Sequence, residues 1–455
     1  ESLGILAALA GSSLRAQIRP EGAALGVPYL SQSWLLCGAA SLAMLERWWG
    51  RRDVFAEDLT ALVRPDENGI RTTELAEAAR SRGWDAMVFS GTRELVTASL
   101  AQSVPVMALI EVRPDRYHYV VVLAWRDGRV TIHDPARRPA MEVDEAAFLK
   151  AWAATDRWAM IVKPGSGSAS ASSTSAPRQA AAPDRAPLPC PPFLERAIAA
   201  AGRDRYEEAD QILAEAAARC PAEPLVTREL AAVRFRQGRF EEADTLVSRY
   251  LVTRPDDAHA SRLLATLRFL AGDHAGDLDA WNVAGEPRVD LVTIDGLRRL
   301  PFRIAMDAVG TRPRTVLTNE ALALARRRVD ELPAIQASFV GYRPVGNGLA
   351  EVTVLLSERP AVGRPVPLVL RNLAGGLGQS RVGLELANLT GAGERWSAGW
   401  RWERARPAIT FSTAIPVHPG IPAVLEMSAA RESFRFSHAS LDETRRSARL
   451  GLAGW

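Results

Sequence analysis

The pattern of apolar and polar positions divides the chain into three parts. Residues 27–163 mix helices and strands, residues 193–284 are helical, and the residues from 288 onward are rich in strands. Residues 37–49 are mostly apolar and stop before Gly50, which predicts a helix ended by a glycine. Residues 72–82 predict a second helix, with a threonine at its start and Gly83 after its end. Both helices precede the first strands of the chain.

Three apolar runs follow these helices and predict antiparallel strands. Residues 104–110 and 117–125 are continuous enough to be buried strands. The dipeptide at 127–128 is Asp-Gly, which favours a tight hairpin turn, and residues 129–134 predict the return strand. Because helices come first and an antiparallel sheet follows, residues 27–163 are predicted to form an α+β unit.

Two stretches carry little apolar surface of their own. Residues 164–192 consist largely of Gly, Ser, Ala, Pro and Thr, which predicts a flexible linker. Residues 1–26 start with a short apolar run followed by small and polar residues. This favours the remnant of a secretory signal peptide whose basic start is missing. The alternatives are a disordered N-terminus and an ordinary exposed helix.

Residues 193–284 contain an internal repeat. The sequence Tyr-Glu-Glu-Ala-Asp at 206–210 recurs as Phe-Glu-Glu-Ala-Asp at 240–244, an offset of 34, and Pro221 recurs as Pro255. This period and pattern resemble the tetratricopeptide repeat, an all-α architecture of helical hairpins. The resemblance implies two and a half hairpins and a concave surface for a protein partner.

Residues 288–360 change to a mixed order of elements. The pattern predicts a strand at 289–294, helices at 301–309 and 318–332, and a strand hairpin around 346–348. This order of strand, two helices and two strands resembles the POTRA domain that precedes outer-membrane barrels. The resemblance implies a small α+β domain.

Residues 361–455 alternate with a period of two. One face of the predicted strands is apolar, and its members are Val382, Leu384, Leu386, Trp396, Ala398, Trp400, Trp402, Ile409, Phe411, Thr413 and Ile415. Strands with one apolar, aromatic-rich face are typical of transmembrane barrels, and a soluble antiparallel sandwich is the alternative. Residues 388–394 resemble the first hairpin of the outer-membrane barrel assembly and two-partner secretion superfamily. About six or seven strands fit, so we expect a partial transmembrane β-barrel.

Composition narrows the classes of function. The net charge is only +3 from 56 basic and 53 acidic residues, which does not favour binding to nucleic acid or to an anionic membrane. The chain has three cysteines. Cys190 and Cys220 flank a predicted helical hairpin, so they either form a disulfide or are two unpaired structural thiols. A disulfide would leave Cys37 as the free thiol.

Candidate chemistry is concentrated in residues 27–163. Cys37 begins a predicted helix, where the helix dipole and a nearby imidazolium favour the reactive thiolate. His118 begins the most apolar strand, and Asp134 ends the strand predicted to pair with it. The hairpin at 127–128 would bring these two residues together as base and orienting acceptor. Gln32, five residues before the cysteine, could donate its side-chain amide to an oxyanion.

Each of these residues also has a structural interpretation. A lone cysteine is often buried and inert, His118 could be a satisfied core histidine, and Asp134 could simply start a turn. His133 is adjacent to the proposed acid and is expected to face away, because neighbours on a strand point to opposite sides. The combination in one compact unit is more specific than its members.

Four short motifs in this unit resemble the bacteriocin-processing peptidase family, which has a papain-like fold. They are residues 28–32 (Pro-Tyr-Leu-Ser-Gln), 37–41 (Cys-Gly-Ala-Ala-Ser), 118–121 (His-Tyr-Val-Val) and 134–135 (Asp-Pro). Known members cut leader peptides after a double glycine. The resemblance implies Cys37 as nucleophile, His118 as base, Asp134 as orienter and Gln32 as oxyanion donor. Ala39 stands where many members carry proline.

The sequence therefore predicts a multidomain cysteine peptidase that is exported to the periplasm and tethered to the outer membrane. Its expected partners are a peptide or protein substrate, a protein bound to the helical repeats, and the outer membrane. No cofactor, metal or nucleic acid is expected. The alternative is an outer-membrane assembly or secretion factor whose papain-like domain binds peptides without cleaving them. A scaffold built on the repeats is a third hypothesis.

Overall fold

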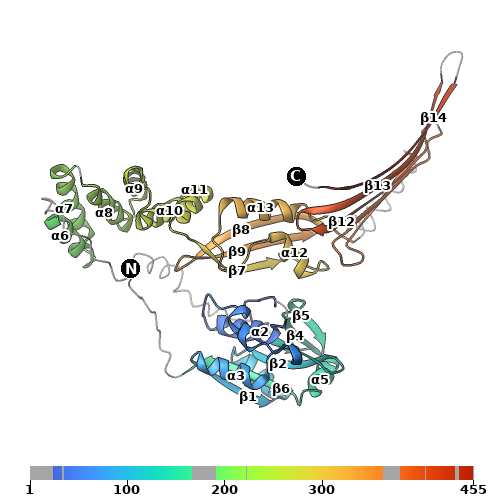
Figure 1. Cartoon of the computed structure of the whole chain (residues 1–455), viewed down its shortest axis with the longest axis horizontal. Coiled ribbons are helices and arrows are strands. Elements are labelled where there is room, and N and C mark those ends of the chain that lie inside the picture. Colours follow the sequence, from blue (N-terminus) through green and yellow to red (C-terminus); the bar gives the residue numbers. More distant parts are fainter. Residues whose placement is uncertain are drawn as a thin grey trace.

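The computed structural model describes residues 24–32, 35–165, 191–221, 223–361, 380–404, 406–435 and 440–453. They form a first unit of the α+β class, a row of helical hairpins, a smaller α/β unit and a five-stranded sheet (Figure 1). The last three follow one another along the long axis, and the first unit lies beside the smaller α/β unit (Figure 1). The predicted N-terminal segment 1–26 and linker 164–192 lie almost entirely outside the described residues.

The first unit is built on a six-stranded sheet in the order β1-β6-β2-β3-β4-β5. All neighbouring strands are antiparallel. The strands are β1 (Trp84–Ser90), β2 (Val106–Arg113), β3 (Arg116–Arg126), β4 (Arg129–Asp134), β5 (Arg138–Asp144) and β6 (Trp158–Pro164). The sheet confirms the three predicted strands and adds β1, β5 and β6, which the sequence pattern did not predict.

Helices cover both faces of this sheet, because the central strands are apolar on both sides. On one face, α2 (Cys37–Trp48) and α3 (Thr72–Ser81) pack against side chains such as Val121. On the other, α4 (Arg93–Ala101) and α5 (Glu145–Ala153) pack against side chains such as Val120. The two predicted helices are confirmed as α2 and α3, whereas α4 and α5 were not predicted. Short 3-10 helices at Ala56–Leu62 and Pro65–Glu67 lie between α2 and α3.

The predicted hairpin between β3 and β4 is present. Asp127 and Gly128 both have positive φ, at 52° and 70°. This is what a two-residue turn with primed geometry requires. The resulting register pairs Val121 with His133, so the start of β3 lies near the end of β4.

The helical stretch contains six helices among the described residues of 191–283, which pair as three antiparallel hairpins. They are α6 (Pro191–Ala201), α7 (Tyr206–Arg219), α8 (Pro224–Arg236), α9 (Phe240–Thr253), α10 (Ala258–Ala271) and α11 (His274–Val283). The sequence predicted two and a half hairpins, so the observed row is longer by one helix. Cys220 is disulfide-bonded, and its predicted partner Cys190 lies outside the described residues. Cys37 is a free thiol.

The smaller α/β unit has the predicted order of strand, two helices and two strands. Its elements are β7 (Arg288–Asp295), α12 (Phe302–Val309), α13 (Asn319–Asp330), β8 (Ile335–Gly346) and β9 (Leu349–Glu358). β9 lies in the middle of the sheet, parallel to β7 and antiparallel to β8. Thr318 caps α13, since its side chain accepts a hydrogen bond from the backbone N–H of Ala321. The resemblance to a POTRA domain stays a prediction.

The C-terminal sheet is an antiparallel meander in the order β10-β11-β12-β13-β14. Its strands are β10 (Arg381–Ala387), β11 (Arg395–Arg401), β12 (Ala408–His418), β13 (Ile421–Arg435) and β14 (Ser440–Leu452). The described residues thus hold five strands where six or seven were predicted, and residues 362–379 lie outside them. The incomplete barrel stays a prediction.

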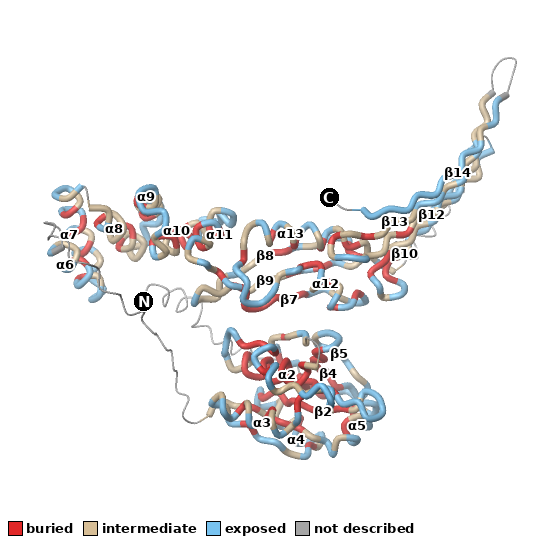
Figure 2. Tube along the Cα trace, in the orientation of Figure 1, coloured by how far each residue is buried: buried red, intermediate tan, exposed pale blue. Residues whose placement is uncertain are grey.

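One face of this sheet is apolar and exposed, as the alternation predicted. The register places Val382 opposite Trp400, and Trp400 opposite Ile409. Trp400 is 54% exposed and Ile409 is 60% exposed. Figure 2 shows that buried positions fill the first unit and become sparse along this sheet. Among the described residues, no helix has both the length and the apolar character needed to cross a membrane.

Candidate active site

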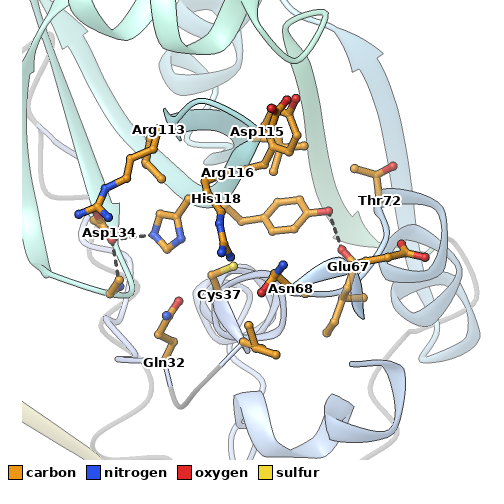
Figure 3. A pocket seen from close by; sticks show the side chains of 18 of the residues that line it. Gln32, Cys37, Glu67, Asn68, Thr72, Arg113, Asp115, Arg116, His118 and Asp134 are labelled. Carbon is orange, nitrogen blue, oxygen red and sulfur yellow. Dashed lines mark hydrogen bonds and ion pairs between the residues drawn. The ribbon is translucent and has the colours of Figure 1, made fainter. Parts of the chain in front are cut away.

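The four residues predicted for catalysis line one cavity of about 640 Å³ in the first unit (Figure 3). Cys37 is the first residue of α2, His118 lies near the start of β3, and Asp134 ends β4. Gln32 lies on the segment that precedes α2. The fold therefore brings all four together from separate elements.

The imidazole of His118 links the acid to the thiol. Its Nε2 lies 2.7 Å from Oδ1 of Asp134. The same ring lies beside the Cys37 thiol, close enough for each of the two groups to shift the pKa of the other. Because Nε2 is engaged by Asp134, Nδ1 is the ring nitrogen left for the thiol. This is the order nucleophile, base and orienting carboxylate.

A glycine after the nucleophile allows α2 to approach β3 closely. A Cβ on Gly38 would lie 3.0 Å from Cδ2 of Tyr119 and 3.3 Å from Cδ2 of Leu75. Tyr119 is the neighbour of His118 on β3, and its hydroxyl donates to the carbonyl of Ile70 at 3.0 Å. The absence of a side chain at position 38 therefore sets the spacing between the thiol and the imidazole.

The electrostatics of the site favour a thiolate–imidazolium pair. Burial alone would raise the pKa of Cys37, but hydrogen bonding to His118, its positive charge, and the backbone N–H groups of Tyr119 and Gly38 lower that pKa. Burial alone would lower the pKa of His118, but hydrogen bonds with Asp134 and Cys37 and their charges raise it to about 9. Both shifts favour a thiolate beside an imidazolium over a neutral thiol beside a neutral ring.

Asp134 is held as a carboxylate although it is only 2% exposed. Burial raises its pKa, but the His118 hydrogen bond and charge, the backbone N–H of Ala136 and the charge of Arg137 lower it overall. The Ala136 N–H donates to Oδ1 at 2.9 Å. The carboxylate can therefore orient the His118 ring and stabilise its positive charge.

Tyr29 supports the backbone of this acid, a role that the sequence did not indicate. Its hydroxyl donates to the carbonyl of Asp134 at 3.0 Å, and the carbonyl of Pro135 lies 3.3 Å away. The backbone N–H of Gln32 donates to the same Pro135 carbonyl at 2.9 Å. The segment with Tyr29 and Gln32 is thus tied to the turn after β4. The motif at 28–32 was the available signal for Tyr29.

Gln32 reaches the cavity with its side-chain amide. Its Oε1 is buried and has no hydrogen-bond partner among the described residues. The two ends of a glutamine amide differ little in shape, so rotation would present Nε2 in its place. The Gln32 amide, turned in this way, and the first backbone N–H groups of α2 can provide donors for a negatively charged oxygen.

His133 does not belong to the site. Its Nε2 donates to the carbonyl of Val27 at 2.8 Å, and its Nδ1 accepts from the backbone N–H of Ala140 at 2.9 Å. Burial lowers its pKa to about 4, with the Val27 contact acting in the opposite direction. It is therefore a neutral structural histidine, and the expectation that it faces away from the site is confirmed.

The rest of the cavity wall is rich in charge. Arg113 lies toward the Asp134 end and Glu67 and Thr72 toward the opposite end (Figure 3). The guanidinium of Arg71 forms an ion pair with Glu67 on this wall. Arg116 and Asp115 come from the tip of the β2–β3 hairpin. None of these wall residues was predicted, because they meet only when the hairpin folds over α2.

Comparisons with known families identify two parts of the chain. Residues 32–166 match the model of the Peptidase C39 family. Residues 200–267 match a model described as the tetratricopeptide repeat. No curated protein is similar enough in sequence to count as a match. The chain thus contains a unit of a cysteine peptidase family followed by tetratricopeptide repeats, as both resemblances predicted.

Solved structures show similar units. A C39-like peptidase from Bacillus anthracis is 19% identical, covers 32% of this chain and 98% of its own, and has a TM-score of 0.29. A double glycine motif protease from an AMS/PCAT transporter, in complex with the leader peptide, is 22% identical over 31% of this chain and 94% of its own, with a TM-score of 0.25. The Sgt2 tetratricopeptide domain from Aspergillus fumigatus is 26% identical over 22% of this chain and 69% of its own, with a TM-score of 0.21. The assignment of the two parts rests on the family models.

Proposed function

We propose that residues 27–163 form a cysteine peptidase that cleaves peptide bonds with Cys37 as its nucleophile. The observation that carries the proposal is the continuous link from Asp134 through His118 to a thiol whose pKa is lowered despite burial. A structural cysteine and histidine would not need a buried carboxylate aligned behind the ring. The open cavity in front of the thiol gives a substrate access to it.

The reaction follows from the positions of these groups. The Cys37 sulfur attacks the peptide carbonyl carbon, and the carbonyl electron pair moves to oxygen, where Gln32 and the backbone N–H of Cys37 donate hydrogen bonds. The His118 imidazolium gives its proton to the leaving nitrogen as the carbon–nitrogen bond breaks and a thioester remains. The neutral ring then takes a proton from water, whose oxygen attacks the thioester. Loss of the thiolate restores the ion pair.

We further propose that the substrate is a leader peptide cut after a double glycine. Two observations support this: residues 32–166 match the C39 family, and a related protease has been solved in complex with the leader peptide. Leu35, Gly69 and Ile70 line the same cavity as Cys37.

The test uses a fluorogenic peptide with Gly-Gly before the cut bond. The full chain should cleave it, and Cys37→Ala should abolish cleavage without changing thermal unfolding. His133→Gln serves as a histidine control, because this side chain lies outside the cavity, and it should keep the wild-type kcat if the protein folds. Cleavage by Cys37→Ala would show that another group is the nucleophile. Binding without cleavage by the wild-type chain would instead favour the peptide-binding assembly factor.

The C-terminal sheet supports a second proposal, that the protein contacts a lipid surface and is tethered to the outer membrane from the periplasm. The supporting observation is the apolar face shared by β10 to β13, where Leu384, Trp400, Ile409 and Met427 are all more than 40% exposed. Exposed apolar faces of this extent mark interaction sites. A protein partner on the helical hairpins belongs to the same proposal, because such repeats present partner surfaces.

Flotation with phosphatidylcholine vesicles tests the lipid contact. The full chain should float with the vesicles, and the double variant Trp400→Ser, Ile409→Ser should float less. Ser412→Thr on the opposite face of β12 is the matched control and should float as the wild type does. A wild-type chain that stays in the dense fraction would contradict the membrane contact, whatever its peptidase activity.

A further inference from the structure

The peptidase unit and the smaller α/β unit of residues 288–358 meet through the segments that carry the active-site residues. Buried side chains from both units belong to one continuous hydrophobic core. The contact includes the end of α2, whose first residue is Cys37. It also includes Tyr29, which holds the backbone of Asp134.

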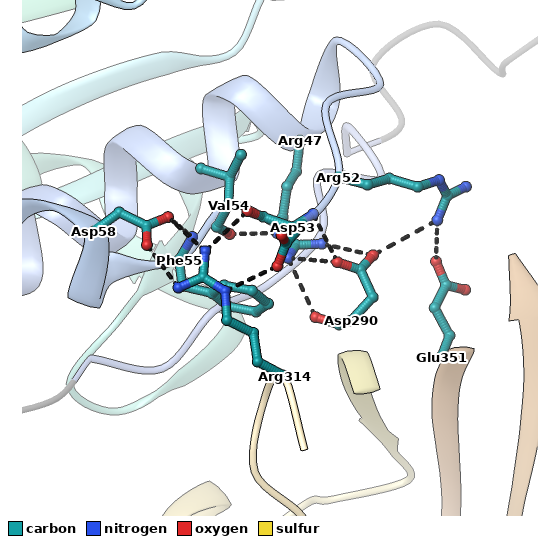
Figure 4. A network of polar contacts seen from close by, with 9 residues as sticks. All are labelled: Arg47, Arg52, Asp53, Val54, Phe55, Asp58, Asp290, Arg314 and Glu351. Carbon is teal, nitrogen blue, oxygen red and sulfur yellow. Dashed lines mark hydrogen bonds and ion pairs between the residues drawn. The ribbon is translucent and has the colours of Figure 1, made fainter. Parts of the chain in front are cut away.

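Asp290 is the central charge of this contact. It lies at a break in the register of β7, where Val289 pairs with Ala350 but Leu291 pairs with Glu351. Such a bulge redirects a side chain out of the regular alternation. The Asp290 side chain is fully buried, and its carboxylate accepts hydrogen bonds from the Arg47 guanidinium at 2.9 and 3.0 Å (Figure 4).

Arg47 is the penultimate residue of α2, and the Asp290 carboxylate neutralises its charge. Its side chain is 3% exposed. Its Nε donates to the carbonyl of Val54 at 2.8 Å, and its guanidinium lies 4.7 Å from the centre of the Phe55 ring. A buried guanidinium without an acidic partner is strongly unfavourable. The end of α2 is therefore fixed to β7.

Arg314 of the smaller unit forms a second attachment to the same loop of the peptidase unit. Its guanidinium bonds the carboxylates of Asp53 at 2.9 Å and Asp58 at 2.8 Å, and it also lies 4.7 Å from the centre of the Phe55 ring. Arg52 adds an ion pair with Glu351 of β9 at 3.1 Å. Opposite charges thus face each other across the contact (Figure 4).

Phe302 of α12 contacts Tyr29, on the segment that precedes α2. Its ring meets the Tyr29 ring edge-on, with centres 4.8 Å apart and planes at 78°. The Tyr29 hydroxyl in turn bonds the carbonyl of Asp134. The smaller unit therefore contacts both the helix of the nucleophile and the support of the acid.

We propose that the α/β unit of residues 288–358 positions the peptidase active site, so that full reactivity of Cys37 requires the two units to be docked. This inference rests on the proposed peptidase function. Arg47 lies ten positions after Cys37, which is about 15 Å along the helix axis. Release of the Asp290 end lets α2 tilt and moves the thiol relative to the imidazole on β3. Asp290, Arg314 and Phe302 are positioning residues in this scheme.

The experiment uses the full chain with Asp290→Asn, which removes the charge at constant size, and with Arg314→Ala. Arg303→Ala on α12 is the control, because its side chain is 90% exposed and pairs with Asp307 of the same helix. Three readouts are compared: amide hydrogen exchange at residues 47–58, the pH dependence of Cys37 alkylation by iodoacetamide, and kcat and KM for the Gly-Gly peptide.

Both interface variants should increase hydrogen exchange at residues 47–58. They should lower the rate of Cys37 alkylation at neutral pH and move its rise to higher pH, because the thiol loses its imidazolium partner. Their kcat should fall roughly tenfold to a hundredfold with little change in KM, since small displacements of reacting groups have effects of this size. The control should match the wild type in all three.

The inference is wrong if an interface variant loosens residues 47–58 but keeps the wild-type alkylation profile and kcat. If Asp290→Asn does not fold, Arg314→Ala decides the question by the same readouts, because this side chain is partly exposed. If the wild type alkylates rapidly at neutral pH but cleaves no peptide, the proposed peptidase function fails. The alkylation profile still decides whether docking positions the thiol.

Discussion

The reactivity proposed for the site depends on the Cys37 thiol and the His118 imidazole, which shift the pKa values of each other. The pKa of the thiol is lowered from its ordinary value, and the pKa of the imidazole is raised to about 9. Between the two transitions the sulfur is a nucleophile and the ring is an acid. Coupled groups titrate as a pair, so these limits belong to the pair.

Peptide cleavage should therefore show a bell-shaped pH dependence. It rises as Cys37 loses its proton below the ordinary thiol pKa, and it falls above about 9, where His118 can no longer protonate the leaving nitrogen. Alkylation of Cys37 should rise in the same way but not fall at high pH, because it needs only the thiolate. Steady-state kcat/KM and iodoacetamide labelling from pH 4 to 11 measure the two curves.

The variant Asp134→Asn tests whether deprotonation of His118 causes the fall of cleavage at high pH. The substitution removes the charge and hydrogen bond that raise the pKa of His118, so the descending limb should move to lower pH. An unchanged descending limb would show that another group controls it.

The packing of α2 against β3 explains why a small residue follows the nucleophile. Gly38 lies so close to Tyr119 that a methyl group at this position would force the neighbouring side chains to shift by a few tenths of an ångström. The helix and strand that carry the thiol and the imidazole are in contact along this line. The spacing of the catalytic pair is therefore a property of two elements.

Gly38→Ala should push α2 away from β3 or displace Tyr119 from Ile70. We expect a loss of roughly 1–3 kcal/mol in stability, the usual cost of overpacking, together with a lower kcat. Gly451→Ala is the control, because a Cβ there meets open space. Thermal unfolding and peptide cleavage measure both effects, and a variant with wild-type kcat would contradict the role given to this contact.

Across the whole chain, local patterns predicted much of the order of elements. The meeting of the four residues proposed for catalysis could be predicted because each lies at or beside the end of an apolar run, and a tight turn brings His118 and Asp134 together. The repeat of 34 residues and the alternation after residue 380 indicated the helical hairpins and the apolar sheet face. The sequence pattern did not predict strands such as β5, because the positions of β5 are only half-buried or exposed and none is fully buried.

Contacts between distant segments could not be predicted in this way. Tyr29 supports Asp134 across 105 positions of sequence. Asp290 follows the alternation of β7 as an ordinary solvent-facing residue would, but it is buried against Arg47, which is 243 positions away in the sequence. A single sequence contains the residues on both sides of such contacts but does not show that they meet.

The contact between Arg47 and Asp290 changes how the chain can be divided for biochemistry. Composition places a domain boundary at the linker after residue 163, which predicts that a cut there releases a self-contained peptidase unit. Such a fragment would keep every group that performs the reaction but would lose the carboxylate that neutralises Arg47. It would also present to solvent the apolar surface that the smaller unit covers. Low activity or poor solubility in that fragment would then reflect a missing neighbour, and would not count against the nucleophile.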